Sequence, residues 1–180
     1  MSLFLIRSFP AALITVLSGC FWMGPTATDT VDRLVPVADA REVRVEGFNG
    51  SITVIGGSDG DTRGHVAVRA DRRAKGVDLA AAEANLEQLK IIVRDEGDRV
   101  VVTTDRPDGF RGGVDYSVVV PDGWVVDART SNGSIRCDGV REAIAKTSNG
   151  RLEFVGVDEA IDGRTSNGRI RIGDREAKKS

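Results

Sequence analysis

The sequence has 180 residues, of which 41% are hydrophobic, 29% are charged and 5% are aromatic, and it contains 21 glycines. A formal net charge of −2 excludes the basic face with which nucleic-acid-binding proteins displace counterions, and it is too small for a disordered polyanion. Many glycines and few aromatic rings predict strands and turns rather than a bundle of helices. The length suits one domain with a short export segment.

The first twenty residues predict a secretion signal. Arg7 is the only charge, and the mostly apolar run over residues 9–17 that follows it has the length of a signal-peptide core and is too short to cross a bilayer. The run ends in an aliphatic residue, two small residues and a cysteine: Leu17, Ser18, Gly19 and Cys20. This ending resembles the bacterial lipobox, which implies cleavage before Cys20 and acylation of its thiol. The alternative is an ordinary signal peptide with a coincidental cysteine.

The lipobox divides the chain into four predicted segments: signal peptide 1–19, lipidated tether 20–40, β-repeat domain 41–175 and charged tail 176–180. The tether is inferred from its prolines, threonines and lack of periodicity. We expect the protein in the cell envelope, with the lipid on Cys20 as its membrane partner. Phe21, in place of an inner-membrane Asp signal, favours the outer membrane in a Gram-negative organism. Cys137 then lacks a disulfide partner and is predicted to be a buried apolar side chain.

Upstream of residue 125, alternating apolar residues predict strands around residues 43–45, 66–70, 90–93, 99–103 and 114–120. One short helix is predicted from Asp78 to Gln88. Asp78 has the chemistry of an N-cap, and the apolar residues of the stretch share one predicted face: Leu79, Ala82, Leu86 and Leu89.

The carboxyl-terminal part repeats itself. Thr-Ser-Asn-Gly occurs at residues 130–133, 147–150 and 165–168, at spacings of 17 and 18 residues. If each Thr is position 0, position 5 is Ile135, Leu152 and Ile170, and position 7 is Cys137, Phe154 and Ile172. Position 6 between them is charged: Arg136, Glu153 and Arg171. This is strand alternation, and residues 48–56 form an earlier copy without Thr-Ser.

Because hairpins need no constant period, the fixed spacing favours an all-β solenoid with coils of 17–18 residues. Positions 5 and 7 would then stack into core columns, and position 6 would form an external charge ladder. The corners would be the Asn-Gly pairs, which tolerate positive φ: Asn132, Gly133, Asn149, Gly150, Asn167 and Gly168. Stacked asparagines can also bond to one another along the column.

These features resemble an exported bacterial family, the "putative adhesin" β-strand-repeat domain. The resemblance rests on the Val-Val-Val-Pro121 strand, the repeated Thr-Ser-Asn-Gly with its alternating strand, and the helix upstream, and it covers roughly residues 41–175. It implies a right-handed β-solenoid and brings no catalytic residues.

Few residues suggest chemistry. His65 is the only histidine, and strand alternation places it opposite Val66 and Val68, on the predicted solvent face. Residues 56–61 nearly match a calcium-binding repeat but occur once, so a turn is favoured. The triplets at Asn49 and Asn132 fit N-glycosylation, but the corner interpretation is preferred. Carboxylates do not cluster at any repeat position, so we expect no enzyme, metal or cofactor.

One basic cluster is a candidate binding face. Arg151 and Arg169 share position 4, and Arg171 is close by; stacked like charges favour an anionic ligand, although a solvated face is the alternative. We therefore predict a non-enzymatic interaction module for a cell-surface glycan or an envelope protein, in adhesion or envelope-stress sensing, that binds through exposed Ser, Thr and Arg rows. A periplasmic spacer or assembly factor is the alternative, and a polysaccharide-active enzyme is less favoured.

Overall fold

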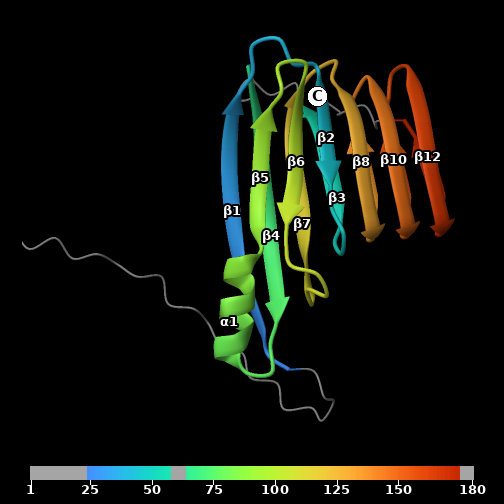
Figure 1. Cartoon of the computed structure of the whole chain (residues 1–180). Helices are drawn as coiled ribbons and strands as arrows, with labels where there is room; N and C mark the ends of the chain where they lie inside the picture. The colour runs from blue at the N-terminus through green and yellow to red at the C-terminus, as the bar shows by residue number, and fades with distance from the viewer. Residues whose placement is uncertain (1–23, 58–63, 175–180) are drawn as a thin grey trace, which may run out of the picture.

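The computed structural model describes residues 24–57 and 64–174, and these form two mixed β-sheets that face each other, with one short helix (Figure 1). Sheet A has the order β1 (Thr26–Pro36), β4 (His65–Lys75), β7 (Gly112–Pro121), β3 (Ile52–Gly57), β9 (Ile135–Asp138), β11 (Leu152–Val155) and β13 (Ile170–Gly173). Sheet B has the order β12 (Ala160–Asn167), β10 (Glu142–Asn149), β8 (Val125–Asn132), β2 (Glu42–Glu46), β6 (Arg99–Asp105) and β5 (Lys90–Asp95). The predicted all-β class is confirmed.

The two halves of the chain pair their strands differently. In the repeats, β8, β10 and β12 are parallel neighbours in sheet B, and β9, β11 and β13 are parallel neighbours in sheet A. Figure 1 shows β8, β10 and β12 side by side at one end of the molecule. At the other end, β1 with β4, β4 with β7, and β5 with β6 are antiparallel. These pairs do not follow coils of constant length, so a uniform solenoid over residues 41–175 is not confirmed.

The predicted columns form the core between the sheets. At position 5, Leu152 pairs with Ile135 and with Ile170, and at position 7, Phe154 pairs with Cys137 and Ile172. Ile135, Cys137, Leu152 and Phe154 are buried, together with Tyr116 on β7 and Trp124 just before β8. Ile170 and Ile172 are 47% and 64% exposed, because β13 is the last strand of sheet A and no described strand lies beyond it. The column register is therefore as predicted, but its last members are not core.

The asparagines of the corners form the predicted ladder. The Nδ2 of each donates to the Oδ1 of the preceding copy: Asn132 to Asn49 at 2.7 Å, Asn149 to Asn132 at 2.8 Å, and Asn167 to Asn149 at 3.0 Å. Because Asn49 is its first member and Ile52 pairs with Ile135, the earlier copy of the repeat is real. The two glycosylation triplets thus fall on structural corners.

The reason predicted for the corner glycines holds for Gly133 alone. Among the described residues no asparagine has a positive φ, and of the three repeat-corner glycines only Gly133 does, at 151°. Close stacking explains the glycines instead: a Cβ on Gly150 would lie 1.9 Å from the Gly133 carbonyl oxygen, and one on Gly168 would lie 1.8 Å from that of Gly150. No side chain fits where successive backbones approach this closely.

The predicted tether is also wrong in part, because β1 covers Thr26–Pro36 and pairs with β4 along its whole length. Most of its side chains are exposed and Ala27 alone is fully buried. An edge strand with so little burial carries no clear hydrophobic alternation, so its residues resemble a tether in the sequence. The attachment of Cys20 lies outside the described residues.

The predicted helix is α1 (Leu79–Gln88), and Asp78 caps it by accepting from the Ala81 amide at 2.7 Å. Ala82 and Leu86 are buried and so is Leu89, which ends the helix, whereas Leu79 is 50% exposed. The predicted face is thus wrong at Leu79, whose side chain lies on the exposed side of the first helical turn while Ala82 of the same turn is buried. None of the described helical residues forms a segment long and apolar enough to span a membrane.

Candidate functional site

Two polar depressions lie on the repeats, one associated with each sheet. The first, which we call the arginine depression, has a volume of about 390 Å³ and is lined by Arg151, Arg169, Ile170, Arg171 and Ile172. The second, which we call the sheet-B groove, has a volume of about 380 Å³ and lies over the ends of β8, β10 and β12. Strand pairing of successive coils creates both, because it places equal repeat positions next to each other.

The arginine depression contains all three residues of the predicted anionic-ligand face. Arg151 and Arg169 are the residues just before β11 and β13, and their carbonyls accept from the amides of Ile135 and Leu152 at 2.9 and 2.8 Å. These main-chain bonds fix the backbone of both arginines while the side chains stay exposed. None of the three guanidinium groups has a carboxylate partner among the described residues, so an anion would meet no competing carboxylate from that part of the chain.

The charge ladder at position 6 holds only in part. Arg136 reaches Glu153 on the next strand at 3.1 Å and Asp138 at 2.8 Å, and the hydrogen bond with Asp138 contributes most to raising the pKa of Arg136. Arg171 pairs in register with Glu153, but the described structure contains no salt bridge between them. Glu153 is therefore engaged by Arg136, and Arg171 belongs to the arginine depression.

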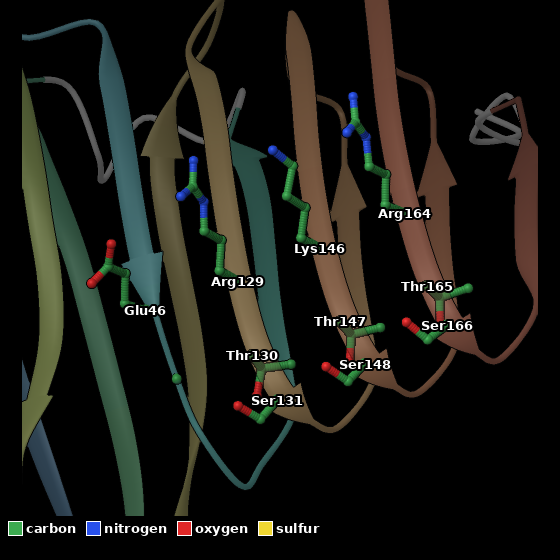
Figure 2. Close-up of a pocket in the computed structure, with 11 residues that line it drawn as sticks. Glu46, Arg129, Thr130, Ser131, Lys146, Thr147, Ser148, Arg164, Thr165 and Ser166 are labelled. Atoms are coloured by element: carbon green, nitrogen blue, oxygen red, sulfur yellow. The ribbon is translucent and has the colours of Figure 1, made fainter.

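The sheet-B groove contains functional residues that the sequence interpretation missed. Arg129, Lys146 and Arg164 pair in register on adjacent strands, and Figure 2 shows their side chains extending side by side from β8, β10 and β12. The signal was available, since the residue before each Thr-Ser-Asn-Gly is basic in all three copies. A second row lies two residues further along each strand and consists of Ser131, Ser148 and Ser166.

The three cations of the groove differ in how far they are neutralised. Asp127, only 5% exposed, binds Arg129 through both oxygens at 2.8 and 2.9 Å and also pairs with Arg44 at 3.1 Å. The hydrogen bond with Asp127 raises the pKa of Arg129. Arg164 has the equivalent partner, Asp162, at 3.2 Å.

Lys146 has no such partner. In the middle coil, Ile144 occupies the position that Asp127 and Asp162 occupy in the two flanking coils. No carboxylate among the described residues pairs with the Lys146 ammonium. The uncompensated charge of the groove therefore lies at its centre.

The threonines of the repeat do not form the exposed row that was predicted. Thr130 and Thr147 are 7% and 6% exposed. Their hydroxyls, with that of Thr165, donate to the corner carbonyls of the preceding copy: Gly50 at 3.3 Å, Gly133 at 3.1 Å and Gly150 at 3.1 Å. Thr lies on the inward face of the strand and Ser on the outward face, so only serine provides exposed hydroxyls.

The remaining candidate residues show no catalytic arrangement. His65 is half-buried at the start of β4, next to buried Val66 as the alternation predicts. Cys137 is fully buried, as predicted, and burial raises the pKa of its thiol to about 12. Within the described residues no three side chains of His, Cys, Asp or Glu are grouped to hold a metal ion. The lipobox residues Leu17, Ser18, Gly19 and Cys20, and residues 58–61 of the calcium-like segment, lie outside the described residues.

Comparison with known proteins gives only distant similarities. No protein-family model matches the sequence, and no curated protein matches it. Among solved structures, a "putative cell adhesion protein" of Clostridium sporogenes is 7% identical, with a TM-score of 0.46 over 83% of this chain and 100% of that one. A "putative adhesin" of Parabacteroides distasonis is 15% identical, with a TM-score of 0.35 over 81% of this chain and 66% of that one.

A "putative lipid binding protein" of Parabacteroides distasonis is 7% identical, with a TM-score of 0.29 over 82% of this chain and 97% of that one. Several of the neighbouring structures carry adhesin names. Similarities at this level transfer neither a ligand nor a mechanism to this chain.

Proposed function

We propose that this protein is an exported, lipid-anchored module of the cell envelope that binds an anionic ligand without catalysis, in adhesion or envelope-stress sensing. The observation that carries the proposal is the arginine depression, where Arg151, Arg169 and Arg171 come together without a carboxylate partner in the described part of the chain. Guanidinium groups bind carboxylate, sulfate and phosphate groups in planar, two-pronged geometry.

The architecture supports this role. We propose that the three copies of the repeat are the last coils of a right-handed β-solenoid, in which each coil adds one cation to the same surface. Parallel pairing of β9, β11 and β13 and of β8, β10 and β12 supports it. A rigid stack of this kind holds charges at fixed spacing, which lowers the entropy lost when a repetitive ligand binds.

A binding assay with matched charge changes tests the ligand face. The full-length protein carrying Arg151→Glu and Arg169→Glu should lose retention on immobilised polygalacturonate, an acidic polysaccharide. The control carries Arg33→Glu and Lys90→Glu, which change the same charge on exposed residues of β1 and β5. Equal retention of the two variants would remove the arginine depression from the function.

Membrane attachment requires a separate test. Replacing Cys20 with Ser should give an uncleaved precursor that incorporates no labelled fatty acid, because the lipobox chemistry needs the thiol. Fractionation of the envelope then gives the membrane in which the native protein resides. Mature, acylated protein from the variant would contradict the lipoprotein proposal.

A structural spacer or assembly factor is the second candidate, and the exposed edge at β13 favours it. Ile172 is 64% exposed there, and an open strand edge can pair with another chain. Cross-linking in the envelope from position 172 should capture one defined protein if the edge is an assembly surface. Absence of any cross-linked protein would exclude the assembly role and leave ligand binding as the remaining candidate.

A further inference from the structure

We propose that the sheet-B groove is a second binding site, separate from the arginine depression, and that its ligand is a linear acidic glycan lying across β8, β10 and β12. The observation is a grid of paired rows, with Arg129, Lys146 and Arg164 in one row and Ser131, Ser148 and Ser166 in the other. Each coil contributes one cation and one hydroxyl to the grid.

The spacing of the grid identifies the kind of polymer. Adjacent strands lie about 4.8 Å apart, and residues two apart on one strand lie about 6.6 Å apart. The sugar residues of an extended glycan advance by a distance close to the strand spacing, so an acidic glycan stays in step with the coils. The anionic groups that turn toward the sheet would meet the cation row, and ring hydroxyls would meet the serine row, where each Ser Oγ can donate and accept.

The same spacing disfavours an acidic peptide. Extended peptide advances about 3.3 Å per residue, so side chains on one face recur every 6.6 Å or so and would fall out of step with the coils. The groove also has no aromatic side chain in its lining, and single-stranded nucleic acids depend on such side chains for base stacking. An acidic glycan is therefore the ligand that matches both charge and period.

Glu46 sets one end of the binding site. It pairs in register with Arg129 on the next strand, so the row of cations is followed by a negative charge on β2. An anionic chain would be repelled beyond Arg129 and would occupy three coils, with its free end directed over β12. We therefore expect about three sugars to fill the site, one over each of β8, β10 and β12.

Lys146 is the residue on which affinity depends most. Arg129 and Arg164 already bind Asp127 and Asp162, so a ligand anion must share them with a fixed carboxylate. The Lys146 ammonium is unshared among the described residues and lies at the centre of the row. It should therefore form the strongest charge-assisted hydrogen bond with the ligand.

The test measures binding of defined oligogalacturonates to the full-length protein by calorimetry. Lys146→Gln should weaken binding of the trisaccharide about tenfold, Lys146→Arg should restore most of it, and Glu46→Gln should strengthen it. Lys90→Gln, on the far edge of the same sheet, should have no effect. Affinity should rise steeply from the mono- to the trisaccharide and level off for longer chains.

The outcomes separate the two sites. Loss of trisaccharide affinity in Lys146→Gln but not in Arg151→Glu with Arg169→Glu assigns the trisaccharide to the sheet-B groove, whatever the retention of that double variant on the immobilised polymer. The reverse result overturns this inference and leaves the proposed function intact. Equal binding of polyglutamate and oligogalacturonate would also overturn it, because the match to sugar spacing would then have no role. Thermal unfolding of each variant checks that the fold is retained, and the Lys146→Arg variant keeps the test informative if Lys146→Gln unfolds.

Discussion

Truncation of Phe154 should reveal how the stack of coils holds its core. The ring lies at position 7 on β11, is 1% exposed and pairs with Cys137 and Ile172 on the adjacent strands. On its other side it is close to the opposite sheet, since a Cβ on Gly163 would lie 2.9 Å from the ring. With neighbours on both strands and across the sheets, the cavity left by Phe154→Ala cannot collapse easily, and we expect a loss of about 3–5 kcal/mol.

Ile172 provides the matched control, because it occupies the same position 7 one coil later but is 64% exposed. Ile172→Ala removes little buried surface and should cost less than about 1 kcal/mol. Equilibrium unfolding of the purified full-length protein in urea would measure both free energies. Costs of similar size for the two variants, or a cost below about 1 kcal/mol for Phe154→Ala, would refute the assignment of the inward face.

Three further predictions concern the corner, a carboxylate and a thiol. Gly150→Ala should lower stability by about 1–3 kcal/mol, because its Cβ would collide with a backbone carbonyl, whereas Gly173→Ala, with open space around it, should be neutral in thermal unfolding. Burial opposes ionisation of Asp115, but hydrogen bonds from Ser51 and the charge of Arg73 outweigh it and lower the Asp115 pKa below 3.8. Its stabilising contribution should therefore be present above about pH 4 and be lost as pH falls through the lowered pKa, so urea midpoints of Asp115→Asn and the native protein should differ at neutral pH and converge in acid. Cys137, with a pKa of about 12, should resist thiol reagents at about pH 8 until the protein is unfolded. Colorimetric titration of the thiol would measure this resistance. Fast labelling of Cys137 in the folded protein would contradict its burial.

The repeat shows how much of the fold could be predicted from local sequence. A period of 17–18 residues can be satisfied by parallel strands stacked in register, and Ile135 with Leu152 and Asn132 with Asn149 lie where that stacking places them. Helix α1 was predictable for a similar reason, because the Asp78 side chain that caps it binds the amide of Ala81, only three residues later. These features depend on neighbours that recur at fixed distances along the sequence.

Residues at the edges of the sheets were predicted less well. The residues of β1 carry few apolar groups, and their strand conformation depends on pairing with β4, some forty residues later in the chain. Ile170 has the same type of side chain as Ile135, yet only Ile135 is buried, because burial requires a strand on each side. Sequence pattern identifies an inward face but does not show whether another layer covers it.

The candidate sites divide in the same way. By itself, the sequence determined the export signal prediction, the repeat, the corner asparagines and the clustering of Arg151, Arg169 and Arg171, since all of these follow from residue types at regular spacing. Only the tertiary structure decided that Thr130 is inward and Ser131 outward, that the corner glycines are required by backbone contact, and that Lys146 lacks the carboxylate that neutralises Arg129. The first two facts depend on contacts between residues on different coils, which no single coil of the sequence contains, and the third depends on which residue lies two positions before each cation on the folded strand.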